Sequence, residues 1–338
     1  MPQSESIPRV ELVCPAGTLP ALRAAVDHGA DAVYIGFRGD TNARNFPGLN
    51  FSIDEAATGI EHAHRAGARV FIALNVYPMA KSWPAATAAV DAAAALGADA
   101  LILADPGLME YARQRHPDLR LHLSVQGSAT NWRAIEFYRR EFGIQRAVLP
   151  RVLSATQVER LISRTTVEIE VFGFGSLCVM VEGRCALSSY ATGHSPNMQG
   201  VCSPAHAVRW EETPEGRQSR LNGVLIDRYA PGEAAGYPTL CKGRFRVDDE
   251  VFHALEEPTA LNALDVLPRL IAAGIRGVKI EGRQRSPAYV AQVTKLMRRA
   301  LDQCLQGAGA APAIVNDALD HLAEGRTHTL GAYHRTWQ

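Results

Sequence analysis

Apolar runs alternate with segments of helical periodicity along most of the chain. One junction recurs: a helical segment ends at a glycine, two residues follow, and a short apolar run begins. It appears in the sequences HGADAVYIG, AGARVFIAL, LGADALILAD, FGIQRAVLP and AGIRGVKIEG. Glycine at this place predicts a helix that ends in a left-handed residue, a conformation that glycine adopts without steric cost. Five copies of one helix-to-strand junction predict a parallel sheet built from repeated βα units.

The apolar runs predict eight strands, each followed by a helical segment. They cover residues 10–14, 32–37, 69–75, 100–104, 120–126, 146–150, 167–173 and 277–281. Eight βα units favour a (β/α)8 barrel, a TIM-like α/β fold, with the whole chain (1–338) as a single barrel-like domain. A doubly wound open sheet is the alternative, because the order of strands in a sheet cannot be read from sequence. No glycine-rich dinucleotide fingerprint follows any predicted strand, which favours the barrel.

The spacing of the βα units breaks once, after the seventh predicted strand. Residues 175–258 form an insertion rich in glycine and proline, and the next helix is expected to begin at about residue 261. In a barrel this insertion lies on the C-terminal face, where active sites are built. Residues 307–338 form a C-terminal tail. Four of the six cysteines fall in the insertion, namely Cys178, Cys185, Cys202 and Cys241.

Alternation along the strands places polar side chains inside the predicted barrel. An interior of this kind is costly unless its charges are paired or meet a polar ligand. We therefore weigh a polar substrate cavity beside the insertion against a polar layer that satisfies itself, for example through a pair between Glu170 and Lys279 on neighbouring strands. The candidate substrate-binding residues come from the inward positions, the strand ends and the loops that follow: Asn42, Arg44, Asn75, Gln126, Glu170, Lys279, Glu281 and Arg283.

Composition and charge narrow the classes of function. The 338 residues are 47% hydrophobic and carry 35 basic and 35 acidic side chains, a formal net charge of zero. Without a basic run, a nucleic-acid partner is not expected. The polar N-terminus, MPQSESIPRV, does not resemble a signal peptide, and the longest apolar stretch is interrupted by Asp91 and Asp99, so no membrane span is expected. We expect a cytoplasmic protein, in which thiols stay reduced and clustered cysteines serve metal or redox chemistry.

The six cysteines fall into two groups. Cys304 lies at helical spacing from apolar residues and Cys14 ends the first predicted strand, so we expect both to pack in the core. The other four lack the paired C-x-x-C knuckles typical of a zinc tetrathiolate. Iron–sulfur sites accept wider spacing, and the surrounding residues are more basic than acidic. Spacing alone leaves zinc and a [4Fe–4S] cluster both open, and the basic surroundings favour the cluster.

Several motifs give the chain a family resemblance. They are ELVCPAGTLPALRAAVDHGADAVYIG, DTNARNFPGLNF, FGSLCVMVEGRC, SSYATGHSPN, GYPTLCKGR, LEEPTALN, VKIEGRQRSPAYV and LGAYHRTWQ, which run from about residue 11 to the C-terminus. The sequence resembles the collagenase-like peptidase family and, within it, members that serve ubiquinone biosynthesis without oxygen.

The resemblance implies a barrel-like domain with a [4Fe–4S] cluster, whose ligands would fall on Cys178, Cys185, Cys202 and Cys241. It also implies a heterodimer with a UbiV-like partner protein that carries its own cluster. The pair would hydroxylate a ubiquinone precursor, with prephenate as the oxygen donor. Other members of the family hydroxylate RNA, which is the competing function that the resemblance brings.

Proteolysis, which the family's historical name suggests, has no support in the residues. The chain contains no HExxH helix motif for zinc. The sequence GFGSLC is not a G-x-S-x-G nucleophile elbow, and Ser176 has no evident His and acid partners. We therefore do not expect peptidase activity.

Overall fold

A closed barrel of eight parallel strands forms the body of the protein. The computed structural model describes residues 10–45, 48–178, 180, 182, 185–194, 202–233, 235–307 and 313–334. Each barrel strand pairs with the next in chain order, and the last pairs with both the first and the seventh, which closes the ring. The (β/α)8 prediction is confirmed, and an open doubly wound sheet is excluded. The strands are β1 (Glu11–Pro15), β2 (Ala32–Ile35), β3 (Arg69–Leu74), β4 (Ala100–Leu103), β5 (Arg120–Leu123), β6 (Arg146–Val148), β7 (Glu168–Ser176) and β14 (Gly277–Ile280).

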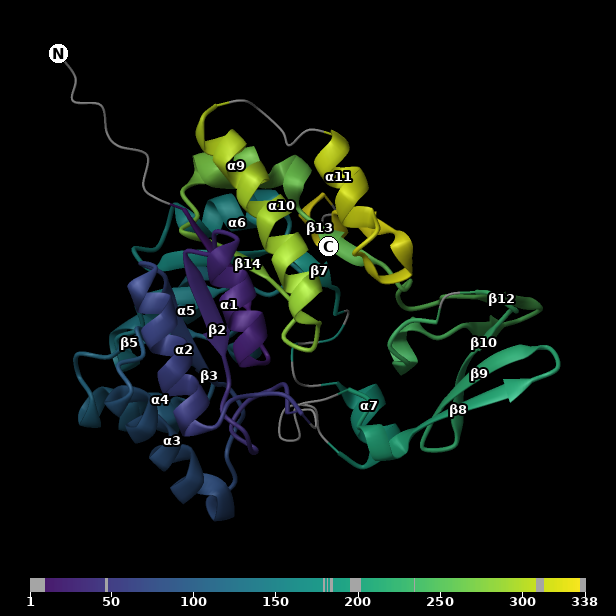
Figure 1. Cartoon of the computed structure of the whole chain (residues 1–338), viewed down its shortest axis with the longest axis horizontal. Helices are drawn as coiled ribbons and strands as arrows, with labels where there is room; N and C mark the ends of the chain where they lie inside the picture. The colour runs from purple at the N-terminus through teal and green to yellow at the C-terminus, as the bar shows by residue number, and fades with distance from the viewer. Residues whose placement is uncertain are drawn as a thin grey trace.

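Helices surround the barrel (Figure 1). The five junction glycines all have positive φ, from 69° at Gly143 to 101° at Gly274, as the recurring motif predicts. At the other end of α2 and α6, Ser52 with Glu55 and Ser154 with Gln157 form capping boxes, which satisfy N–H groups of the first turn. The helices between and after the strands are α1 (Leu19–Asp27), α2 (Ile53–Arg65), α3 (Trp83–Ala95), α4 (Pro106–Arg115), α5 (Trp132–Phe142), α6 (Ala155–Ile162), α9 (Leu267–Ala273) and α10 (Pro287–Leu305).

The core has two layers because side chains on each strand alternate between the helices and the barrel interior. The outer layer joins strands to helices and includes Leu121, Val171 and Val278. The inner layer is smaller and holds residues such as Tyr34 and Phe71. Polar side chains share the interior with it, as the alternation predicted, and Glu170 and Lys279 are both buried there.

The insertion after β7 contains two small sheets and a short helix. Three antiparallel strands form one sheet and two form a hairpin, and Figure 1 shows them extending to one side of the barrel. The chain returns through β13, which pairs antiparallel with β7. The helix expected at about residue 261 therefore begins later, at Leu267, because residues 260–262 form this strand. The elements are α7 (Ala186–Thr192), β8 (Val208–Thr213), β9 (Gly216–Leu221), β10 (Val224–Tyr229), β11 (Phe245–Val247), β12 (Glu250–Phe252) and β13 (Ala260–Asn262).

The C-terminal tail folds back onto the barrel and the insertion. After α11 (Ala313–Asp320), the strand β15 (His328–Thr329) pairs with β13. The hydroxyl of Tyr333 donates to the carbonyl oxygen of Phe172 in β7, at 2.8 Å. Short 3₁₀ turns complete the chain: η1 (Ala80–Ser82), η2 (Val125–Gly127), η3 (Ala205–Ala207), η4 (Leu240–Lys242), η5 (Leu264–Val266), η6 (Glu324–Arg326) and η7 (Gly331–Tyr333).

One predicted strand is shorter than expected, and the described helices bear on the expectation of no membrane span. The fifth strand ends at Leu123, earlier than expected, because residues 125–127 turn into η2. Among the described residues, no helix is long and apolar enough to cross a membrane.

Candidate functional site

A polar cavity lies at the end of the barrel where the strands' carboxyl ends meet the insertion. It encloses about 590 Å³ of empty space, part of it open to solvent. Among the described residues, four cationic and two carboxylate side chains line it, so positive charge is in excess there. Six of the eight predicted substrate residues are among its lining residues: Arg44, Asn75, Gln126, Lys279, Glu281 and Arg283. The other two, Asn42 and Glu170, lie behind this lining and hold it in place.

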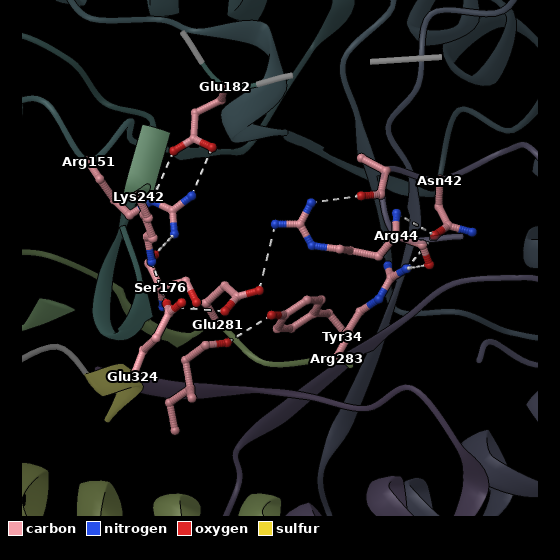
Figure 2. A network of polar contacts seen from close by, with 12 residues as sticks. Tyr34, Asn42, Arg44, Arg151, Ser176, Glu182, Lys242, Glu281, Arg283 and Glu324 are labelled. Atoms are coloured by element: carbon pink, nitrogen blue, oxygen red, sulfur yellow. Dashed lines mark hydrogen bonds and ion pairs between the residues drawn. The ribbon is translucent and has the colours of Figure 1, made fainter. Parts of the chain in front are cut away.

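Arg283, after β14, is the centre of a buried hydrogen-bond group on one wall (Figure 2). Its Nη2 donates to the Oδ1 of Asn42, to the carbonyl oxygen of Arg44 at 3.0 Å and to the Oδ1 of Asn50 at 3.0 Å. Burial lowers the pKa of Arg283 to about 10. Its Nε is buried and has no hydrogen-bond partner within the described part of the chain. Asn42 therefore positions Arg283, and Arg283 keeps one donor unused.

The floor of the cavity is an ion network inside the barrel. The Nζ of Lys279 lies 2.7 Å from the Oε1 of Glu170 and 4.0 Å from the centre of the Tyr34 ring. The Nη1 of Arg146 lies 3.2 Å from the other oxygen of Glu170. Burial alone raises the pKa of Glu170, but the charges of Lys279 and Arg146 outweigh burial and hold that pKa below its usual value. Glu170 thus pairs with Lys279, as predicted, and stays ionised beneath the cavity.

Two arginine–carboxylate pairs form the wall nearest the cysteines. Arg151, after β6, makes a bidentate pair with Glu182, with distances of 2.9 and 2.8 Å. Arg44 makes a looser pair with Glu281, at 3.7 Å, and is about one-third exposed. Figure 2 shows the two guanidinium groups on opposite sides of Glu281. Arg44 is therefore the more weakly paired of the two arginines, and a ligand carboxylate can compete with Glu281 for its guanidinium.

Amide side chains line the remaining wall. The Oδ1 of Asn75 accepts from the backbone N–H of Ala43 at 2.9 Å, and its Nδ2 donates to the Oγ of Ser124 at 3.1 Å. Asn75 therefore ties the loop after β2 to strand β5's end. The Oε1 of Gln126 is buried without a hydrogen-bond partner among the described residues. The cavity thus retains an unused acceptor as well as an unused donor.

The sequence interpretation missed four polar lining residues: Tyr34, Ser124, Arg151 and Glu182. Alternation along the fifth predicted strand gives Ser124 an inward position, which is the signal that could have found it. Arg151 follows the sixth predicted strand directly, and a search of the residues one step beyond each strand end would have found it. Glu182 carried a different signal, since it is the only acid between residues 175 and 210.

The four cysteines of the insertion lie in one neighbourhood. Each thiol interacts electrostatically with at least one of the others. Cys185 caps α7, where its Sγ accepts from the N–H of Ser188 at 3.3 Å, and the Ser188 hydroxyl donates to the carbonyl oxygen of Cys202. Cys241 lies in η4. No three Cys, His, Asp or Glu side chains of the described residues form a ready metal-ligating group.

Burial favours the protonated form of three of these thiols. It raises the pKa of Cys178 to about 12 and that of Cys202 to about 11, and it also raises the pKa of Cys241. Metal binding would have to replace these protons. Cys14 and Cys304 are instead buried in the outer core layer, as expected.

The cavity and the thiols adjoin each other through the two arginines. Arg44 lies within electrostatic reach of Cys202, and Arg151 lies within reach of Cys178. The expected basic surroundings of the cysteines are partly neutralised: Lys242 pairs with Glu324, and Arg244 pairs with Glu233. Parts of four of the quoted motifs fall outside the described residues, namely 46–47, 179, 181, 183–184, 195–197 and 335–338.

Comparison with known proteins identifies the family. The profile described as peptidase family U32 matches residues 17–335. The chain belongs to peptidase family U32. Among relatives, a tRNA hydroxylation protein of Escherichia coli is 33% identical over 347 residues, which cover 96% of this chain and 74% of that protein. A tRNA hydroxylation protein of Bacillus subtilis is 32% identical, over 86% of this chain and 63% of that protein.

A third relative also carries a hydroxylation name. The 23S rRNA 5-hydroxycytidine synthase of Escherichia coli is 31% identical over 93% of this chain, which spans 42% of that protein. The resemblance to a collagenase-like family is thus confirmed at the level of the family, and three of its relatives are named for hydroxylation of RNA. The chain spans only part of the length of each of these proteins.

Proposed function

We propose that this chain is an iron–sulfur subunit of an oxygen-independent hydroxylase. It acts in the cytoplasm on a ubiquinone precursor, as a UbiU-like subunit paired with a UbiV-like partner, and takes the hydroxyl oxygen from prephenate. The hydroxylation names of its relatives support the class of reaction. The choice of a ubiquinone precursor over RNA is supported by the sequence resemblance and by the net charge of zero.

The observation that carries the proposal is a cationic cavity whose Arg44 and Arg151 lie within electrostatic reach of two of the four grouped thiols, those of Cys202 and Cys178. A small carboxylated donor suits this cavity because Arg44 is only loosely paired and Arg283 keeps a buried N–H donor unused. Gln126 offers a buried acceptor for a hydroxyl group. Enclosed sites with a few convergent polar groups are typical of small-molecule binding. Asn75 and Lys279 then shape the cavity. From behind its lining, Asn42 positions Arg283 and Glu170 positions Lys279.

In kind and number, the four cysteines match the group that the resemblance implies. Cys178, Cys185, Cys202 and Cys241 would supply four thiolates, the usual ligand set of a [4Fe–4S] cluster. When bound, the cluster supplies one-electron chemistry. Four cysteine ligands would leave no iron free for substrate, so the cavity's own side chains would hold the substrates. Arg44 and Arg151, which lie beside the thiols, offset part of the negative charge of such a group.

Anaerobic purification and metal analysis test the cofactor. We expect four iron and four sulfide per chain, with broad visible absorption, and loss of both in Cys→Ala variants of any of the four cysteines. Cys304→Ala is the matched control, because this thiol lies in the outer core and away from the group. Stoichiometric zinc without visible absorption would exclude the cluster.

RNA hydroxylation is the second candidate, and the names of the relatives favour it. An anaerobically grown deletion strain separates the two functions when ubiquinone and hydroxylated nucleosides are both measured by mass spectrometry. We expect ubiquinone to fall and hydroxylated nucleosides to stay unchanged, with recovery by the wild-type chain and not by Cys241→Ala. The opposite pattern would assign the protein to RNA.

A further inference from the structure

Arg151 joins the cysteine-bearing segment to the cavity wall. It extends from the end of β6, and its guanidinium packs 4.5 Å above the Phe172 ring of β7. Nε and Nη2 hold the two oxygens of Glu182, and Nη1 donates to the carbonyl oxygen of Ser176. The side chains of Arg151 and Glu182 are 4% and 8% exposed. All four groups are thus fixed in a site from which water is largely excluded.

Glu182 connects the ion pair to the cysteine-bearing segment. In sequence it lies between Cys178 and Cys185, so the bidentate pair fastens the segment between two of the thiols to the barrel. Both Arg151 and Glu182 also line the cavity. Figure 2 shows the Arg151 guanidinium paired with the Glu182 carboxylate. The same guanidinium lies within electrostatic reach of the Cys178 sulfur, which becomes negative when it loses its proton, and it lines the cavity that would hold an anion.

We propose that Arg151 couples occupation of the cavity by a carboxylate to the charge of the group held by the cysteines. This inference rests on the proposed function, since it takes both the bound group and the carboxylated ligand from it. A carboxylate in the cavity adds negative charge beside Arg151 and attracts its guanidinium. The net positive charge that faces the thiols is then smaller. Reduction adds one negative charge there. Binding of the anion and reduction of the group therefore oppose each other.

Thermodynamic linkage makes the effect reciprocal. If the ligand lowers the midpoint potential, the reduced protein must bind the ligand more weakly by the same factor. We expect prephenate to bind the reduced protein about tenfold more weakly than the oxidised protein, which corresponds to a fall of about 59 mV in the midpoint potential for one electron. Because the charges lie in a low-dielectric site, the effect survives moderate salt.

An anaerobic potentiometric titration of the iron–sulfur protein, with dithionite as the electron donor, tests the coupling with and without saturating prephenate. Arg151→Gln should reduce the ligand-dependent shift to less than half of its wild-type size. Glu182→Gln, which releases Arg151 towards the cavity, should enlarge it. The control is Glu159→Gln, which breaks a bidentate pair of the same kind with Arg269, on the exposed surface. Its shift should equal that of the wild type.

The outcomes separate this inference from the function on which it rests. Absence of the iron–sulfur group, or of prephenate binding by calorimetry, would overturn both. A wild-type protein that holds the group and binds prephenate but shows no shift would overturn the coupling alone. An unaltered shift in Arg151→Gln would also overturn it. If Arg151→Gln does not retain the group, a Glu182→Gln shift equal to or smaller than that of the wild type refutes the coupling.

Discussion

Replacing Glu170 by glutamine should destabilise the barrel strongly at neutral pH and much less at alkaline pH. Glu170 is fully buried beneath the cavity, where it holds Lys279 at 2.7 Å and Arg146 at 3.2 Å. Arg146 keeps two other carboxylates, Glu11 and Glu168, in the variant. Lys279 has no second carboxylate partner among the ion pairs of the described residues. The variant therefore leaves a buried lysine without a counter-charge.

The magnitude follows from the two states open to Lys279. If it stays charged, removal of its partner costs about 3–5 kcal/mol, as for other buried ion pairs. If it releases its proton instead, the cost at pH 7 is capped at about 4.6 kcal/mol, from an unfolded pKa near 10.4 and about 1.36 kcal/mol per pH unit. At pH 9 the same cap falls to about 1.9 kcal/mol.

The sign of the pH dependence is fixed by the direction of the shift. Burial already lowers the pKa of Lys279, against the opposing charge of Glu170. Without Glu170 the pKa falls further, so the folded variant binds fewer protons than the unfolded chain, and its stability rises with pH up to about 10.4. The difference in free energy of unfolding between wild type and variant should therefore shrink from pH 7 to pH 9.

Urea unfolding followed by tryptophan fluorescence at both pH values measures this difference. Glu159→Gln, at an exposed pair, serves as the control and should leave the free energy of unfolding unchanged at either pH. A loss below about 1 kcal/mol for Glu170→Gln at pH 7 would show that Lys279 is not held as a buried charge. An equal loss at both pH values would refute the proton-release argument.

Three further predictions concern the cavity and the tail. Gly17→Ala should weaken prephenate binding at least tenfold by calorimetry, because its Cβ would meet the backbone oxygen of Arg283. Gly67→Ala strains a left-handed backbone position (φ 75°), but its Cβ would meet open space, so the variant should be less stable and still bind prephenate normally. Arg283→Lys should speed backbone hydrogen exchange in residues 42–45, since a lysine cannot replace the fork that holds this loop; unchanged exchange would contradict that role. Tyr333→Phe should lower the free energy of unfolding by about 1–2 kcal/mol, because a buried carbonyl oxygen loses its donor, and an unchanged urea midpoint would show that this contact does not hold the tail.

The repeated βα units could be predicted from the sequence because they depend on interactions between residues that are close together in the chain. A helix that ends at glycine and a strand that follows two residues later are set by backbone sterics and by hydrophobic spacing within about ten residues. The alternation along a strand likewise placed Glu170 and Lys279 in the interior before their pairing was known. The short strand β13 could not be found in this way, because three residues form a strand there only through pairing with β7 and β15.

The composition of the cavity wall depended on contacts between distant residues. Arg151 meets Glu182 across 31 positions, and Arg283 meets Asn42 across 241. The sequence by itself determined eight βα units, the polar interior and the grouping of four cysteines in one insertion. Only the tertiary structure decided that the ring closes and that Arg151 stands between the thiols and the cavity. The reason is physical: periodicity fixes which side of a strand a residue faces, whereas closure of the barrel fixes which strand ends meet.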